Sequence, residues 1–289
     1  MSVISGGKTV FCEGKDSSLD YKIINRLTEN LSEKVTIVPS GSKFTFSIFA
    51  GGYFSGNKQT GQKYLVFRDR DFDIRPTTEI KLLQFSNIKQ GFLSHRACIE
   101  NYLLNPELIH QYWLEKYKEK QENPASKWGY KDSPDILVLD NWIKQSASVI
   151  KDYQAIRWAL ADLQFGESRV QIKTTWTGGS GKLPKSLDNS DCKRQALNLI
   201  ANFQASIKNV NQNRFEESLS YYQQLFSQEE FWEQQQYLIW FHGKDLQKAM
   251  QKQESQYIAL SHFFNWATDY VKLNQHSDLM ELQVKIREL

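Results

Sequence analysis

Three acidic side chains directly follow short apolar runs, a position from which carboxylates far apart in a sequence can act together. Glu13 follows the apolar residues 9–12, and Asp69 and Asp71 follow residues 64–67. Short apolar runs bounded by polar residues are typical of buried strands. Because the carboxyl ends of parallel strands meet at one edge of an open sheet, we expect these carboxylates to converge.

Grouped carboxylates favour one kind of chemistry. They repel one another unless a cation neutralises them, and an all-oxygen ligand set suits Mg²⁺ or Mn²⁺ better than a soft metal. Glu100 lies just past residues 91–95, a fourth expected strand, and could join the cluster or lie on an exposed helix face. The pattern predicts a magnesium or manganese site that acts on phosphate groups.

The elements around these residues indicate an α/β domain. A helical pattern capped by Ser17 or Ser18 separates the strand at 9–12 from another at 35–38, which makes a β-α-β unit. A second helix is expected at residues 44–50. Strands that alternate with helices favour a mostly parallel sheet flanked by helices.

The second half of the chain has a different sequence pattern, with long helical repeats of apolar residues and two polar stretches. Apolar residues between 139 and 163 recur at helical spacing, whereas the polar stretches 118–134 and 174–191 are expected to be loops. We therefore expect a catalytic domain at residues 1–115, followed by a mainly α-helical region at residues 116–289.

Composition narrows the class of protein only slightly. A formal net charge of +3 is too small to indicate a nucleic-acid-binding protein by itself. The three cysteines form no C-x-x-C pair and the five histidines show no ligand spacing, so neither a disulfide framework nor a zinc site is predicted. With no apolar run of about 18 residues and no secretion signal, a reducing cytoplasm is the expected location.

Two motifs, in order along the chain, resemble a known signature. Residues 10–16 contain a Glu-Gly pair after the first strand, and residues 67–73 contain Asp-Arg-Asp after the third. Together they resemble the TOPRIM signature of topoisomerases, primases and OLD-family nucleases. Residues 98–106, with Glu-Asn-Tyr, resemble the OLD-like TOPRIM group that contains the nuclease subunit of the PARIS anti-phage system. The resemblance covers residues 8–106 and extends, outside them, to residues 243–245.

The resemblance implies roles for the strand-end carboxylates. Glu13 would act as general base or metal ligand, and Asp69 and Asp71 would hold the ion that bridges the scissile phosphate and the nucleophile. Glu100 would complete a second metal site. Two-metal sites stabilise both the attacking and the leaving oxygen of the reaction.

Two further residues are candidates by resemblance. Relatives often carry an acid four positions after the first Glu; Ser17 occupies that position here, and Asp16, one step earlier, is the nearest candidate ligand for a second metal. Lys244 either stabilises charge in the transition state or belongs to a turn before a helix capped by Asp245.

The predicted function is metal-dependent hydrolysis of phosphodiester bonds in DNA or RNA, including tRNA, as an anti-phage effector. Residues 178–182 fail the P-loop pattern, because Trp176 stands where a glycine is needed and Leu183 follows Lys182. The resemblance therefore implies a separate ATPase partner. The helical region would shape the substrate groove or form a partner or homodimer interface.

Two alternatives remain open at this point. Asp-x-Asp after a strand also occurs in HAD-like phosphatases, although bulky Arg70 and the upstream Glu-Gly strand disfavour that interpretation. The chain could instead be a non-catalytic interaction or regulatory module with a vestigial acidic loop, whose aromatic helices bind a partner.

Overall fold

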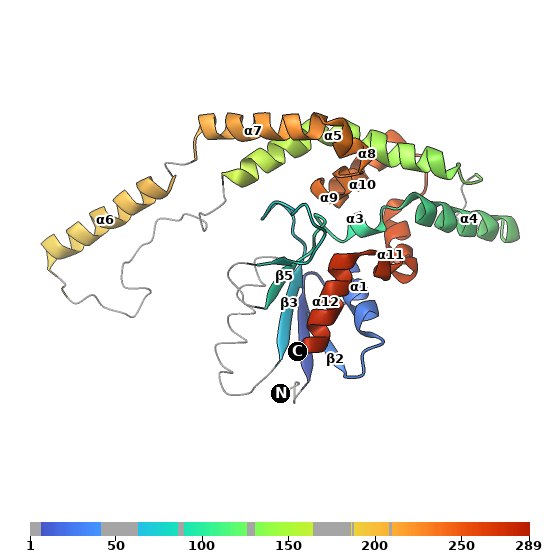
Figure 1. Cartoon of the computed structure of the whole chain (residues 1–289), viewed down its shortest axis with the longest axis horizontal. Coiled ribbons are helices and arrows are strands. Elements are labelled where there is room, and N and C mark those ends of the chain that lie inside the picture. The colour runs from blue at the N-terminus through green and yellow to red at the C-terminus, as the bar shows by residue number, and fades with distance from the viewer. Residues whose placement is uncertain are drawn as a thin grey trace. The chain divides into compact units, whose positions relative to one another are not determined.

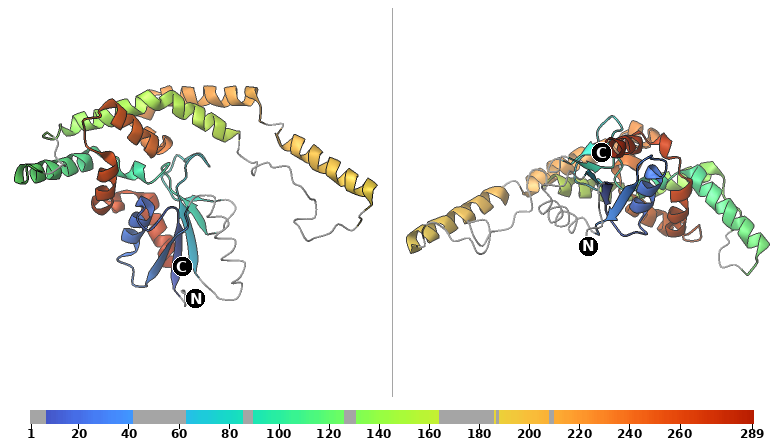
Figure 2. Two further views of the ribbon diagram at one scale, coloured as in Figure 1. Left: turned by 180° about the vertical axis from the view of Figure 1, so that it is seen from behind. Right: turned by 90° about the horizontal axis from the view of Figure 1, so that it is seen from below.

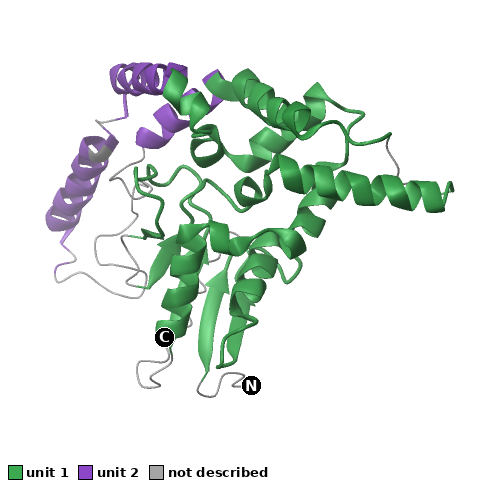
Figure 3. Ribbon diagram, turned by 45° about the vertical axis from the view of Figure 1, so that its right-hand side comes forward, with its two compact units in different colours: residues 1–151, 229–289 green, residues 152–228 purple. Residues whose placement is uncertain are grey.

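The computed structural model describes most of the chain, in residues 7–41, 63–85, 90–125, 131–163, 186, 188–207 and 210–289. Contacts divide it into two compact units, Met1–Lys151 with Glu229–Leu289, and Asp152–Gln228 (Figure 3). The sequence-based boundary near residue 115 falls inside the first unit. The helix expected at residues 44–50 and the glycine-rich residues 178–182 lie outside the described residues.

The described strands of the first unit form one sheet with the order β2-β1-β3-β5-β4 (Figure 1). Its strands are β1 Lys8–Cys12, β2 Val35–Pro39, β3 Tyr64–Arg68, β4 Leu83–Gln84 and β5 Gly91–Leu93. All the pairings are parallel except that of β4 with β5. The prediction of a mostly parallel α/β sheet is confirmed.

The centre of the sheet is apolar because both of its faces are covered. Every residue of β1 is buried, which is the continuous pattern expected of an interior parallel strand. The predicted first helix is α1 Leu19–Thr28, and its cap is Ser18, whose Oγ accepts a hydrogen bond from Tyr21 N at 3.3 Å. The buried face of α1 carries Ile23, Ile24 and Leu27.

The C-terminal helices complete the same core. α11 Leu260–Tyr270 and α12 Ser277–Glu288 both pack against α1, and Figure 2 shows the red α12 beside the blue α1. Gln283 Nε2 on α12 donates to Leu27 O at 2.7 Å, and Glu281 Oε2 accepts from Leu82 N at 2.8 Å. The last helices therefore belong structurally with the sheet, although they are distant from it in sequence.

The other described elements after the sheet are helical. They are α3 Glu100–Leu103, α4 Pro106–Glu122, α5 Ile136–Asp162, α6 Asn189–Ile207, α7 Gln212–Ser227, α8 Glu229–Glu233, α9 Tyr237–Trp240, α10 Gly243–Gln253 and the 3-10 turn Leu273–Gln275. None of the described helices is long and apolar enough to cross a bilayer.

The two expected loops are shorter than their polar composition predicts. α4 continues to Glu122, supported by the ion pairs Lys116–Glu119 at 2.6 Å and Lys118–Glu122 at 3.8 Å. Such pairs stabilise an exposed helix that lacks an apolar stripe. At the end of the second stretch, α6 already begins at Asn189.

Candidate metal-dependent active site

The first and third predicted strands are neighbours, so the acids that follow them leave the sheet at one edge. Phe11 of β1 pairs with Val66 of β3 in parallel register. Glu13 lies just beyond the end of β1, and Asp69 just beyond the end of β3. The parallel register of β1 and β3 therefore brings Glu13 and Asp69 to the same edge of the sheet, as expected.

Gly14 makes the tight turn that carries the chain from β1 toward α1. Its φ is 88°, and a Cβ at this position would lie 2.5 Å from both Cβ and Oγ of Ser18, the cap of α1. Gly14 also pairs with Gly41, with N–O distances of 2.7 and 3.0 Å. The glycine of the Glu-Gly motif is thus needed for a close approach of the helix start to the strand end.

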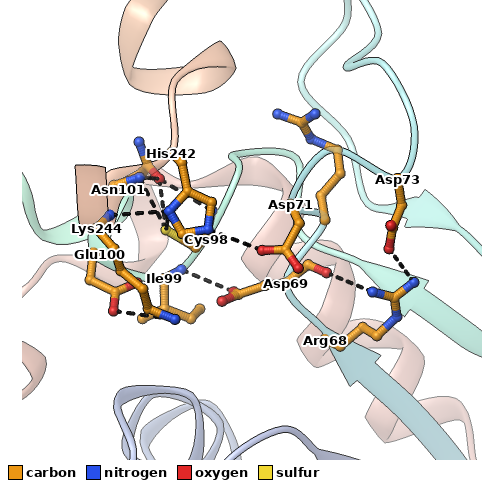
Figure 4. Close-up of polar contacts among 12 residues, drawn as sticks. Arg68, Asp69, Asp71, Asp73, Cys98, Ile99, Glu100, Asn101, His242 and Lys244 are labelled. Carbon is orange, nitrogen blue, oxygen red and sulfur yellow. Dashed lines mark hydrogen bonds and ion pairs between the residues drawn. The ribbon is translucent and has the colours of Figure 1, made fainter. Parts of the chain in front are cut away.

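Asp69 is the buried centre of the acidic cluster. Only 3% of the residue is exposed, and its Oδ1 accepts a hydrogen bond from Ile99 N at 3.0 Å (Figure 4). Burial raises the pKa of Asp69 well above its usual value, and the nearby carboxylates of Asp20 and Glu100 raise it further. Crowded, desolvated carboxylates of this kind are stabilised by a cation.

Asp20 belongs to this cluster, although the sequence analysis did not single it out. Burial raises the pKa of Asp20 to about 7, with Glu100 as the next cause and Glu13 as a smaller one. Its Oδ1 is buried and has no hydrogen-bond partner among the described residues. A signal was present, because Asp20 precedes Ile23 and Leu27 by three and seven positions and so lies on the buried stripe of α1.

Asp71 is held by a histidine from a distant part of the chain. His242 Nε2 lies 3.1 Å from Asp71 Oδ1 (Figure 4). The imidazole stacks on Phe72 with ring centroids 6.0 Å apart. Lys244 N donates to Nδ1 of His242 at 3.3 Å. Because Nδ1 is the acceptor, Nε2 carries the proton and donates to the carboxylate.

Glu100 and Lys244 form the opposite side of the cluster. Glu100 is 8% exposed, which excludes the alternative of an exposed helix face, and its Oε1 lies 3.8 Å from Lys244 Nζ. Burial lowers the pKa of Lys244, but Glu100 and Asp69 outweigh that effect and leave the pKa above its usual value. The ammonium is therefore charged, and with 58% of its side chain exposed it remains accessible to a ligand.

Asn101 fixes the segment that carries Lys244. Its Nδ2 donates to Phe241 O at 2.9 Å, and its Oδ1 accepts from Gly243 N at 2.9 Å. α10 begins directly after His242, which caps it; the cap is not Asp245, as the turn alternative expected. The Glu-Asn-Tyr run thus supplies one acid to the cluster and one amide that positions the lysine.

Cys98 lies within the cluster, where hydrogen bonds hold its thiol. Its Sγ and one oxygen each of Asp69 and Glu100 lie within 4.8 Å of one another. Burial raises the pKa of the Cys98 thiol well above its usual value, so the thiol stays protonated. It donates to Asn101 Oδ1 at 3.1 Å and accepts from Gly243 N at 3.2 Å. The carboxylate oxygens are the hard donors of the cluster, and the thiol is its soft one.

The remaining charged residues near the cluster have other positions. Asp16 is exposed, whereas Asp69 and Glu100 are buried. The carboxylate of Asp73 pairs with Arg68 at 2.5 Å. Arg70, between the two aspartates of the motif, is fully buried and points into the protein.

No protein-family profile matches this chain, and a search of curated proteins finds no match either.

Proposed function

We propose that this protein is a Mg²⁺- or Mn²⁺-dependent nuclease of the TOPRIM type. The observation that carries the proposal is the cluster of Glu13, Asp20, Asp69 and Glu100 at the carboxyl edge of a parallel sheet, where burial and mutual repulsion raise the pKa of Asp20 and Asp69. A strand-end carboxylate cluster beside a charged lysine suits phosphate chemistry better than a purely structural role.

The donor set fits a hard divalent cation. Asp20 Oδ1 is a buried oxygen without a hydrogen-bond partner among the described residues, and the nearby thiol is protonated and occupied by hydrogen bonds. Asp69 and Asp71 would hold the ion, with Asp20 and Glu100 as candidates for a second one. When bound, the metal supplies charge stabilisation at the scissile phosphate and lowers the pKa of the attacking water.

The protein's own groups would divide the remaining work. Glu13 would accept a proton from the attacking water as the new P–O bond forms and the bond to the leaving oxygen breaks. Lys244 would place its ammonium against the charge that develops on the phosphate oxygens, and Glu100 orients that side chain. His242 holds Asp71 through the hydrogen bond described above.

The substrate and the biological context rest on the motif resemblance. We propose a nucleic-acid substrate, DNA or RNA and including tRNA, in the cytoplasm. An ATPase partner that controls the nuclease, an anti-phage role and a homodimer are part of the same proposal. The lysine beside the cluster, exposed at its tip, is compatible with a phosphodiester substrate.

Cleavage assays test the proposal directly. Plasmid, single-stranded DNA and tRNA are incubated with the protein, with and without a cognate ATPase, in Mg²⁺, Mn²⁺ or EDTA. We expect cleavage with either metal, none in EDTA, and none with Asp69→Asn or Glu13→Gln, whereas Asp16→Asn cleaves normally. Equal cleavage by all variants, or hydrolysis of p-nitrophenyl phosphate without nucleic-acid cleavage, would refute the nuclease assignment.

A further inference from the structure

A polar cavity lies beside α3, the short helix that contributes Glu100 to the acidic cluster. It has a volume of about 190 Å³, and Tyr102, from that helix α3, is part of its wall. Its other walls include the start of α4 and the segment between α11 and α12. Its polar lining includes Arg96, Lys272, Gln275 and His276.

Arg96 presents donors that the protein does not use. Its Nη1 donates to Asn101 O at 2.6 Å, and its guanidinium carbon lies 5.3 Å from the centre of the Tyr102 ring. The guanidinium makes no other hydrogen bond or ion pair with the described residues. An arginine that lines a cavity and packs on a ring, with N–H groups that no described residue accepts, is preorganised for an oxyanion.

The charge of the cavity wall is positive. Lys272 is exposed and forms no ion pair with any described residue, and the only acid of the lining is Glu107, which is exposed in the first turn of α4. Burial lowers the pKa of Arg96, and the nearby carboxylate of Asp278 opposes that shift. Asp278 Oδ2 accepts from Tyr102 OH and His95 N, whereas its buried Oδ1 has no hydrogen-bond partner among the described residues. The start of α4 adds the positive end of a helix dipole.

His276 adds a neutral hydrogen-bonding group. Burial lowers its pKa to about 4, with a smaller effect from Arg96, so the ring is neutral at pH 7. The ring packs edge-on against Tyr102 at 5.2 Å, and its nitrogens have no hydrogen-bond partner among the described residues. A neutral imidazole can donate one hydrogen bond to an anion.

We propose that this cavity binds a phosphate group, with Arg96 and Lys272 as charged contacts and His276 and Gln275 as neutral donors. Arg96 follows β5, and Lys272, Gln275 and His276 all belong to the segment between α11 and α12. Together they line one cavity, which matches the several acceptor oxygens of a phosphate. The site is separate from the acidic cluster, whose carboxylates repel an anion without metal. The proposal does not depend on the nuclease assignment, since it concerns binding alone.

Histidine NMR on the full chain, without metal, tests the site. The chain has five histidines, and loss of one Hε1 signal in His276→Asn assigns the signal of His276. Titration with inorganic phosphate, a nucleoside 5′-monophosphate or a short single-stranded oligonucleotide should shift this signal saturably. Equal affinities for the three ligands would show that the site recognises the phosphate group alone. Tighter binding of the mononucleotide or of the oligonucleotide would show that the bound phosphate belongs to that kind of molecule. No saturable shift, or equally tight binding of acetate, would overturn the proposal.

Charge reversal at the rim gives a second measurement that does not risk the fold. Lys272→Glu should weaken phosphate binding roughly tenfold, because it removes one charged contact and adds a repulsive one. The matched control is Lys144→Glu, at an exposed position on α5 away from the cavity lining, which should bind like the wild type. Equal phosphate affinities of Lys272→Glu and the wild type would contradict the assignment.

Discussion

The side-chain oxygen of Asn101 accepts a hydrogen bond from the backbone N–H of Gly243 at 2.9 Å, across 142 positions of sequence. The contact joins α3, which carries Glu100, to the start of α10, which carries Lys244. The lysine therefore reaches the carboxylates because two backbones approach closely. A residue without a side chain is needed at the point of contact.

Gly243→Ala should destabilise the protein and displace Lys244. A Cβ at this position would lie 2.7 Å from Asn101 Oδ1, 2.9 Å from Asn101 N and 2.9 Å from Glu100 Cβ, and the second of these atoms is backbone that cannot rotate away. We expect a loss of about 1–3 kcal/mol in the free energy of unfolding, measured by urea denaturation. Lys248→Ala, at an exposed position of the same helix, is the control. Equal stability of the two variants would show that this contact is not tight.

Asp20→Asn and Asp16→Asn should behave differently, although the two residues are only four positions apart. The change at Asp20, whose Oδ1 is buried, removes a desolvated carboxylate that Glu100 repels, so without metal the free energy of unfolding at pH 7 should increase. Mn²⁺ affinity, measured by calorimetry, should fall at least about tenfold. Exposed Asp16 should affect neither quantity. If Asp16→Asn weakened Mn²⁺ binding and Asp20→Asn did not, Asp16 would be the ligand of the second metal, as the sequence predicts.

The comparison of these two aspartates shows which part of the site the sequence can predict. Glu13 and Asp69 were predictable because strand ends are local features, and parallel pairing brings them to one edge. Asp20 shares the stripe of Ile23 and Leu27, but whether a charge on such a stripe meets a core or a site depends on what packs there. His242 contacts Asp71 across 171 positions, a pairing that no local pattern encodes.

In the fold, too, features set by neighbouring residues are predictable from the sequence, whereas contacts between distant segments are not. Strand order, the first helix and its cap follow from local periodicity, whereas the packing of α11 and α12 against α1 does not. Residues 118–122, at the start of the polar stretch 118–134, belong to α4. Apolar spacing does not predict this last part of the helix, because ion pairs support it.

Arg70→Lys should be strongly destabilising, although the positive charge is kept. The guanidinium donates to three backbone carbonyls: His95 O at 3.0 Å, Ile74 O at 2.9 Å and Ile239 O at 2.6 Å. Lysine cannot reach the three acceptors in this fork geometry, so buried carbonyls lose their donors. We expect a loss of about 2–4 kcal/mol in chemical denaturation. The exposed Arg287→Lys change is the control, and similar midpoints for both variants would rule out this role for Arg70.

His276 should make stability depend on pH below neutrality. Its folded pKa is about 4, below the usual histidine value, because burial and Arg96 disfavour the charged ring. The unfolded chain therefore binds more protons between about pH 4 and 6.5, so this contribution to stability is complete above that window and is lost as the pH falls through it. The nearby carboxylate of Asp278 opposes the shift only partly.

The difference in unfolding free energy between the wild type and His276→Asn isolates this contribution, because the other groups titrate in both proteins. From pH 7 to pH 5 the wild type should lose about 1–2 kcal/mol relative to the variant. His262→Asn, at an exposed position, is the matched control. A wild type that gains stability relative to His276→Asn on acidification would show that the ring is protonated in the folded protein.

His242 should affect metal binding by orienting Asp71, and two substitutions separate this role from its role as a helix cap. In His242→Asn, the side-chain oxygen can still accept from Lys244 N, since asparagine is a favoured cap, but it is too short to reach Asp71 Oδ1. The contribution of the cap to stability should be preserved while Mn²⁺ affinity falls about 10- to 100-fold, as is typical when a partner of a metal ligand is lost.

His242→Ala removes both contacts and should also lose about 1 kcal/mol of stability through the cap. Calorimetry with Mn²⁺ and thermal denaturation without metal measure the two effects separately. If His242→Asn bound Mn²⁺ as tightly as the wild type, the hydrogen bond to Asp71 would be a packing contact only. A lower affinity at unchanged stability would instead show that this histidine positions a ligand, because a cap by itself cannot alter metal binding without altering the fold.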